Sequence, residues 1–429
     1  MPEDKKFSEK VRAVVDSLDF IKIFSCFQMA INPNKLVIAF LVVVFLAFCG
    51  VSFDVLSSSV KGITLKDAKV YNNTVLEVFD EDQQKITELD VYKSMPEYMD
   101  KFVAGGSFGD QVGVFATMYD HLAKSLNILT VRLLKLDLVG VFEELGQVAI
   151  TFDWALKYHT VYTLVYMLIF VVVMAVGGGA ICRGAALEIC KGNKPSILDN
   201  INYGRRKFTD FLCAPLAPIV LVLIFGSVIS LVGFIGNLPW AGEIIMGILT
   251  IFSLLIGLVL VMILIGFAGG VHMMLPSIAI EGTDFNDAVS RGYCYAYSKP
   301  WLLGLYGFTG AVYGAICYLF VRLCAFTLLR VTYAFMAFGI FADSQSNAGI
   351  DKLRAVWPQP EFFNLTGKAI AVNIDWSEHF SHLLVSIAVL IISGVVSAFI
   401  ISFYFSCCTV LYTLCRKAVD NDPIEKIEV

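Results

Sequence analysis

Long apolar stretches with almost no charged residues dominate the chain, and they predict membrane-spanning helices. A helix of about 20 residues rises about 30 Å, which is enough to cross the hydrocarbon layer of a bilayer. Backbone groups in lipid must bond within their own segment, which favours helices over isolated strands. We predict an all-α integral membrane protein with six spans, at residues 36–55, 159–182, 213–236, 243–274, 301–328 and 383–415. The fourth and sixth spans exceed a perpendicular crossing, so they must tilt, break at glycine or continue past the membrane.

The segments between these spans have distinct characters. In residues 1–35 the apolar positions recur at helical spacing, which predicts a cytoplasmic interfacial helix or a helix packed on the protein's own cytoplasmic loops. Residues 56–158 are long enough to fold as a unit, and two 3.6-residue periodicities at 112–136 and 138–157 predict a helical extracytoplasmic cap. The four-helix membrane core then covers 159–330, an extracytoplasmic loop 331–382, and a cytoplasmic tail 416–429.

Basic residues predict the orientation of the spans. They cluster before the first span, between the second and third, and directly after the sixth, and such clusters favour the cytoplasmic side. We therefore expect a multi-pass protein with both termini in the cytoplasm. Hydrophobic residues make up 57% of the chain and charged residues 16%, with mean hydropathy +0.74. The formal charge of -5 gives no electrostatic support for a nucleic-acid partner, so we expect membrane lipids and membrane proteins, or a second copy, as partners.

Two cytoplasmic connections resemble one another and suggest an internal repeat. The first runs from Glu188 through Asp199 to Gly204, and the second runs from Glu281 through Asp287 to Gly292. Each follows a glycine-rich helix end and leads through aromatic and basic residues into the next span. Spans two and three would then be one helical hairpin, and spans four and five a parallel copy of it. Such repeats occur in transporters, although a plain scaffold could be built in the same way.

The densest polar group lies in the second of these connections. Asp287 and Arg291 are four residues apart, a spacing that favours an ion pair on one helix face. Asp284 and Asp287 would also charge the first turn of a short helix that Arg291 closes. The alternative is a gate or partner-docking site in which Glu281 binds Arg183 or Arg291. Its candidate residues are Arg183, Glu188, Glu281, Asp284, Asp287 and Arg291.

Arg322 is a charged residue inside the fifth span. An arginine at the centre of a bilayer is costly, so it should face protein, water or the interface. Counting from the start of the span places it near the outer boundary, where its side chain could reach water. An anion-attracting pore residue is the alternative. In two spans, Gly266 with Gly270 and Gly310 with Gly314 have the GxxxG spacing that lets helices pack closely in lipid.

Sequence motifs do not identify a reaction. The chain has no Walker loop, nucleophile elbow or zinc-protease motif, and its eleven cysteines include no CxxC pair. His379 and His382 could share a helix face at a spacing compatible with metal ligands, but we prefer to interpret them as interfacial polar residues at a span entrance. We expect no metal, no cofactor and no enzymatic activity, although a membrane-embedded lipid enzyme stays open.

Residues 278–291, from Ile278 to Arg291, carry a family resemblance. This stretch resembles a sequence pattern of uncharacterised multi-span membrane proteins of planctomycete-type bacteria, as do Arg183 and the run 178–181. More distantly, the pattern is similar to membrane domains that accompany glycerophosphodiester phosphodiesterases, whose catalytic domain has no counterpart here. The resemblance covers spans two to five and implies a bacterial inner membrane rather than a mechanism.

These observations predict a non-enzymatic integral membrane protein, a scaffold or an accessory subunit of a complex in the bacterial envelope. The absence of converging charge within the spans supports it. The alternative is a small-solute or lipid transporter or channel built on the two hairpins, which would need a polar path between them.

Overall fold

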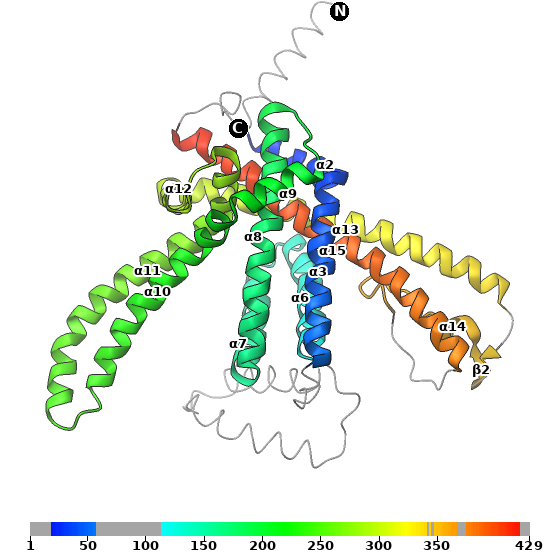
Figure 1. The fold of residues 1–429 in the computed structure, drawn as a ribbon, viewed down its shortest axis with the longest axis horizontal. Coiled ribbons are helices and arrows are strands. Elements are labelled where there is room, and N and C mark those ends of the chain that lie inside the picture. The colour runs from blue at the N-terminus through cyan, green and yellow to red at the C-terminus, as the bar shows by residue number, and fades with distance from the viewer. Residues whose placement is uncertain (1–18, 57–112, 341–342, 345–346, 368–374, 421–429) are drawn as a thin grey trace, which may run out of the picture. The chain divides into compact units, whose positions relative to one another are not determined.

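The computed structural model describes residues 19–56, 113–340, 343–344, 347–367 and 375–420 (Figure 1). Six of its helices are long and apolar enough to cross a membrane, which confirms the all-α fold class. They are α3 (Pro33–Leu56), α8 (Thr160–Lys191), α10 (Phe208–Ile235), α11 (Ala241–Glu281), α13 (Pro300–Gly339) and α15 (Trp376–Asp420).

Three of these helices are about twice as long as the hydrocarbon layer of a bilayer is thick. Helices α11, α13 and α15 have 41, 40 and 45 residues. At about 1.5 Å per residue each is roughly 60 Å or more in length, about twice the hydrocarbon layer. The predicted fourth and sixth spans therefore continue as unbroken helices, and the fifth runs about ten residues further than its apolar stretch suggested.

Short helices join the long ones where the basic residues cluster. Helix α9 (Ile197–Arg206) begins at Ser196, whose side chain accepts a 3.2 Å hydrogen bond from the Asp199 backbone. Helix α12 (Phe285–Ser298) follows Gly282, which ends α11 with a φ of 67° and donates to Ile278 at 2.9 Å. Only glycine adopts this conformation readily, so Gly282 allows the chain to turn back along α11.

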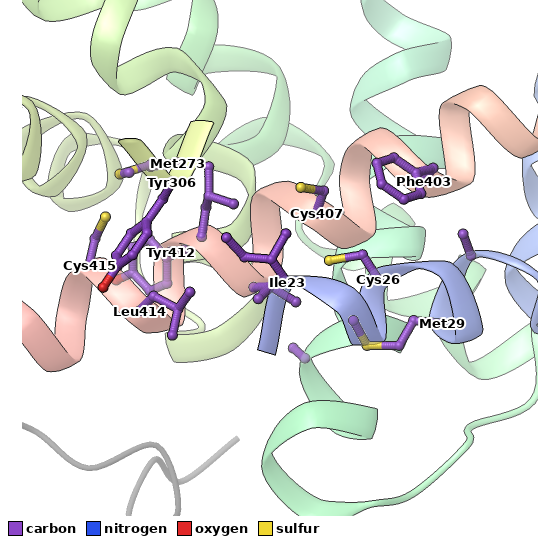
Figure 2. Close-up of a cluster of buried hydrophobic side chains, with 14 of the residues drawn as sticks. Ile23, Cys26, Met29, Met273, Tyr306, Phe403, Cys407, Tyr412, Leu414 and Cys415 are labelled. Carbon is purple, nitrogen blue, oxygen red and sulfur yellow. The ribbon is translucent and has the colours of Figure 1, made fainter. Parts of the chain in front are cut away.

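The chain forms two compact units, the first made of Met1–Val42, Val171–Val356 and Asn373–Val429. Its apolar core includes the short helices η1 (Asp19–Phe24) and α2 (Ser25–Ala30), packed on α13 and α15. Ile23 and Cys26 are fully buried, and Figure 2 shows Cys26 beside Cys407 of α15. The Ser402 hydroxyl donates to Ala30 O at 2.9 Å, which satisfies a carbonyl at the end of α2.

This burial changes the interpretation of the N-terminal segment. Residues 19–31 pack on the protein's own helices, as the alternative interpretation held, but on α13 and α15 rather than on cytoplasmic loops. The ring of Phe27, for example, lies against Phe320 and Phe399, with centroids 6.0 and 5.9 Å apart. These contacts favour the packed helix for residues 19–31, whereas a position at the membrane interface stays a prediction. Residues 1–18 lie outside the part described.

The second unit comprises Val43–Phe170 and Trp357–Val372. Its helices α6 (Val114–Leu134) and α7 (Leu138–Tyr158) agree with the two helices expected in the cap. Asp54 accepts hydrogen bonds from the Phe115 backbone (3.0 Å) and the Tyr162 hydroxyl (2.7 Å), and so caps the start of α6. The remainder of the predicted cap, residues 57–112, lies outside the described residues.

The segment expected to be a loop, residues 331–382, contains some regular structure. Strands β1 (Asp343–Ser344) and β2 (Asn347–Asp351) form an antiparallel pair, which α14 (Lys352–Val356) follows. The sequence pattern did not predict these short elements because five residues or fewer carry too little periodicity.

Candidate functional site

Glu281, the last residue of α11, is the centre of a network of charged and hydroxyl groups. Its carboxylate accepts from Arg291 of α12, at 2.8 and 2.7 Å to its two oxygens, and from Arg416 of α15 at 2.9 Å. The Tyr412 hydroxyl donates to the same carboxylate and lies 3.2 Å from the Ser277 hydroxyl. The Glu281 side chain is only 9% exposed, so these partners replace the water it loses.

Glu188, the matching residue of the first repeat, has a similar role near the end of α8. It accepts from the Lys35 ammonium of α3 at 2.7 Å, and Asn32 donates to the same oxygen at 3.3 Å. The Lys35 side chain is only 2% exposed. A lysine this deeply buried stays charged only beside a carboxylate, so the pair joins the first span to the second.

Arg183 and Tyr203 connect the two repeats directly. The Arg183 guanidinium of α8 donates to the Ala279 carbonyl of α11 at 2.8 Å, and it lies over the Tyr203 ring at 4.3 Å. The Tyr203 hydroxyl of α9 donates to the Ile278 carbonyl at 2.9 Å, and burial raises the pKa of this phenol above its usual range. Arg183 satisfies a carbonyl near the end of α11, whereas the Ile278 carbonyl accepts from both Gly282 and Tyr203.

We refer to these eight residues as the polar clasp. They are Lys35, Arg183, Glu188, Tyr203, Glu281, Arg291, Tyr412 and Arg416. They come from α3, α8, α9, α11, α12 and α15, so the clasp ties together helices that are far apart in the sequence.

The two connections share a packing geometry as well as a sequence pattern. A Cβ on Gly204 of α9 would lie 2.7 Å from the Val176 carbonyl of α8. A Cβ on Gly292 of α12 would lie 2.9 Å from the Gly270 carbonyl of α11. Each glycine is five residues after the matching aspartate, Asp199 or Asp287, so equivalent positions make the same close backbone approach.

The aspartates of the second connection behave less as expected. Asp284 and Asp287 do stand at the start of α12, as the helix-start interpretation predicts. Arg291, however, binds Glu281 rather than the exposed Asp287, because α12 folds back onto α11. Water solvates the exposed Asp287, whereas the buried Glu281 carboxylate requires a cation as a partner. Asp284 lies 3.7 Å from Lys207, whose pKa is raised by its hydrogen bond to Asp210.

Arg322 and the paired glycines lie at helix contacts. Arg322 is buried at 8% exposure, and its guanidinium donates to the Tyr318 hydroxyl. It therefore faces protein, one of the three surroundings expected for it, while its depth near the outer boundary stays a prediction. A Cβ on Gly310 or Gly314 would meet Cys407 or Phe403 of α15, so this pair is a helix-packing seam. Gly266 and Gly270 instead pack against α12 rather than another span.

The two histidines before the last span differ in their surroundings. The two ring nitrogens of His382 lie 2.7 Å from the Val356 carbonyl and 3.4 Å from the Ser386 hydroxyl. His379 is exposed. Among the described residues no three histidine, cysteine or acidic side chains converge as metal ligands.

The clasp has the chemistry of a structural joint. Its two carboxylates are bound to cations, and its arginines and tyrosine hydroxyls donate to carbonyls or carboxylates. Sequence reasoning identified Arg183, Glu188, Glu281 and Arg291. It missed Lys35 and Arg416, which it used only for orientation, and it missed Tyr203 and Tyr412. Their signal was weak: Lys35, Tyr203 and Arg416 stand near helix ends, and Tyr412 lies further inside α15.

No family model, no curated protein and no solved structure matches this chain. The resemblance to membrane proteins of planctomycete-type bacteria therefore stays a prediction.

Proposed function

We propose that this chain is a non-enzymatic scaffold or accessory subunit of a membrane protein complex in the bacterial cytoplasmic membrane. The hairpin of α10 and α11 carries this proposal. None of the residues in the most apolar 18-residue window of α11 is buried, and in α10 the share is 6%. Leu254, in the first half of α11, is 70% exposed. Apart from the surface that α10 and α11 bury on each other, the hairpin thus offers much of its apolar surface to lipid or to another membrane protein.

Glycines on the hairpin support a protein partner over lipid alone. Gly226 and Gly233 of α10 and Gly247 and Gly257 of α11 have no atom of another part of the chain within 4 Å of a Cβ position. Glycine costs about 1 kcal/mol relative to alanine in a helix, and no contact within the chain offsets that cost. Lipid tails supply no hydrophobic force between helices, and small residues let a neighbouring helix come close. A docked helix accounts for these glycines.

The polar clasp supports the same function because it fixes the base of the hairpin. The paired charges hold α11 and α12 to α15, while Arg183 and Tyr203 hold the end of α11 to α8 and α9. A platform that is rigid at one end and apolar along a hairpin suits the assembly of other membrane helices. It offers no free nucleophile or base for a reaction.

Extraction from native membranes into polymer-bounded lipid discs tests this proposal. We expect a companion protein at fixed stoichiometry. Gly247→Leu with Gly257→Leu should release it, because the added side chains occupy the space that a partner helix would use. Ile251→Phe, at another exposed position of α11, is the matched control and should keep the companion. A chain that emerges with lipid alone, whatever the variant, would contradict the proposal.

A small-solute or lipid transporter is the second candidate, and the shared geometry of the two connections favours it. Inverted or parallel repeats in transporters meet around a substrate path. The weakness of this candidate is that α10 and α11 bury so little of their surface on other spans. Solute flux in proteoliposomes that is lost in Glu281→Gln would support it over the scaffold.

A further inference from the structure

Helix α9 exposes a basic face that its packing does not use. Gly204 and Asn200 point inward, where Asn200 lies against Gly184 of α8, and both are buried. The exposed positions are Leu198, Asp199, Asn202, Arg205 and Arg206. The Asp199 carboxylate accepts from the Ser196 hydroxyl at 2.7 Å, so the two arginines remain the cationic part of this face. Neither Arg205 nor Arg206 forms an ion pair with a carboxylate of the described residues. The neighbouring Lys207, in contrast, lies 3.1 Å from Asp210.

The second repeat shows that packing does not require these arginines. Aligning Gly204 with Gly292 places Tyr293 and Cys294 of α12 at the positions of Arg205 and Arg206. The Tyr293 hydroxyl turns onto α11 and donates to the Ile263 carbonyl at 2.9 Å. The same helix in the same packing therefore carries no basic pair in one repeat and an exposed basic pair in the other.

The position of the pair relative to the spans indicates what it meets. Arg206 is two residues before Phe208, where the apolar helix α10 begins, and α9 itself follows the end of α8. A short amphipathic helix between two spans lies at the level of the lipid headgroups. The exposed Leu198 is seven residues before Arg205, on the same face, and suits insertion at the boundary between headgroups and acyl chains.

We propose that Arg205 and Arg206 bind the phosphate of an anionic phospholipid. The planar guanidinium group donates two parallel hydrogen bonds to a phosphate, and two adjacent arginines also offset a second negative charge on the headgroup. The site selects anionic over zwitterionic lipid through this net charge. This inference is independent of the proposed scaffold role, because it concerns α9 rather than the hairpin.

Native mass spectrometry of the purified full-length protein tests the site. The protein is mixed with equal amounts of phosphatidylglycerol and phosphatidylcholine, and the two retained lipids are counted. We expect Arg205→Ala with Arg206→Ala to lower the ratio of phosphatidylglycerol to phosphatidylcholine by roughly ten-fold or more, since each basic residue near an anionic surface contributes about 1 kcal/mol. Lysine at both positions should retain part of the preference.

The matched control removes the same charge elsewhere. Lys352→Ala with Arg354→Ala, in α14, should leave the ratio unchanged, whereas an equal loss there would mean that total charge decides and would overturn the proposal. Adding inorganic phosphate distinguishes the two sources of the anion: displacement of the lipid by millimolar phosphate would also overturn it. The proposal would also be overturned if the double alanine variant kept its lipid ratio but inserted in the opposite orientation. Cysteine labelling of the C-terminal tail would reveal that orientation.

Discussion

Glu281→Gln tests whether the polar clasp stabilises the protein through charge. The substitution keeps the shape of the side chain and an acceptor oxygen for Tyr412, but it leaves Arg291 and Arg416 facing a neutral group. The Glu281 and Arg416 side chains are 9% and 16% exposed, whereas Arg291 is 36% exposed and water can solvate part of its charge. Breaking a fully buried pair costs about 3–5 kcal/mol, so we expect roughly 3 kcal/mol for this mostly buried cluster.

Thermal unfolding in mild detergent, followed by circular dichroism, measures the effect. For a chain of this size, roughly 3 kcal/mol corresponds to a fall in apparent Tm of about 3–6 °C. Glu243→Gln is the matched control, since it makes the same chemical change at an exposed position in the first turn of the same helix. That variant should unfold within about 1 °C of the parent protein.

A double-mutant cycle then assigns the loss to the pair. Arg416→Gln in the Glu281→Gln background should cost less than in the parent protein, by about 1 kcal/mol or more. Equal Tm values for Glu281→Gln and Glu243→Gln would refute the reasoning. Neutralising a buried carboxylate that two cations contact must lower the stability if the geometry is correct.

Three further variants test other contacts. Gly292→Val should lower the Tm and separate α12 from α11, since even a Cβ would lie 2.9 Å from a backbone oxygen, whereas Gly257→Val faces open space and should be tolerated in the same assay. Lys35→Met should lower the stability by roughly 3 kcal/mol, because it removes the cation of a buried ion pair. Cysteines introduced at neighbouring positions of α3 and α8 should then lose their crosslink. Unchanged crosslinking would contradict the proposal that Lys35 holds these two helices together. Burial lowers the pKa of His159 below 6.5, so folding disfavours protonation of this side chain. The stability that its neutral form contributes is present above pH 6.5 and is lost as the pH falls below that value. His159→Gln should therefore flatten the acid side of a plot of Tm against pH, and an unchanged acid side would exclude this cause.

The spans were predictable from the sequence because lipid imposes a simple requirement. Each crossing needs a continuous apolar helix, so hydropathy alone places all six. The lengths were harder to predict. Helix α13 runs on to Gly339 although Arg330 and Tyr333 interrupt its apolar character, because backbone hydrogen bonding continues after the hydrophobic stretch ends.

The clasp could be predicted only in part because its partners are distant in the sequence. A local rule pairs Asp287 with Arg291, but the fold brings Arg291 to Glu281, ten residues earlier, and brings Arg416 there from the last span. Nothing in the local pattern around Lys35 or Arg416 shows which carboxylate each will meet. Arg322 shows the same limit, since counting along a helix gives depth but not which face the side chain occupies.

Photocrosslinking from the α10–α11 hairpin in native membranes tests the central claim most directly. A photoreactive amino acid at Leu254, which is 70% exposed, samples whatever covers the first half of α11. The scaffold account predicts a discrete protein adduct of constant mass, which Gly247→Leu with Gly257→Leu abolishes. Adducts with lipid alone, in the parent protein as in the variant, would contradict it.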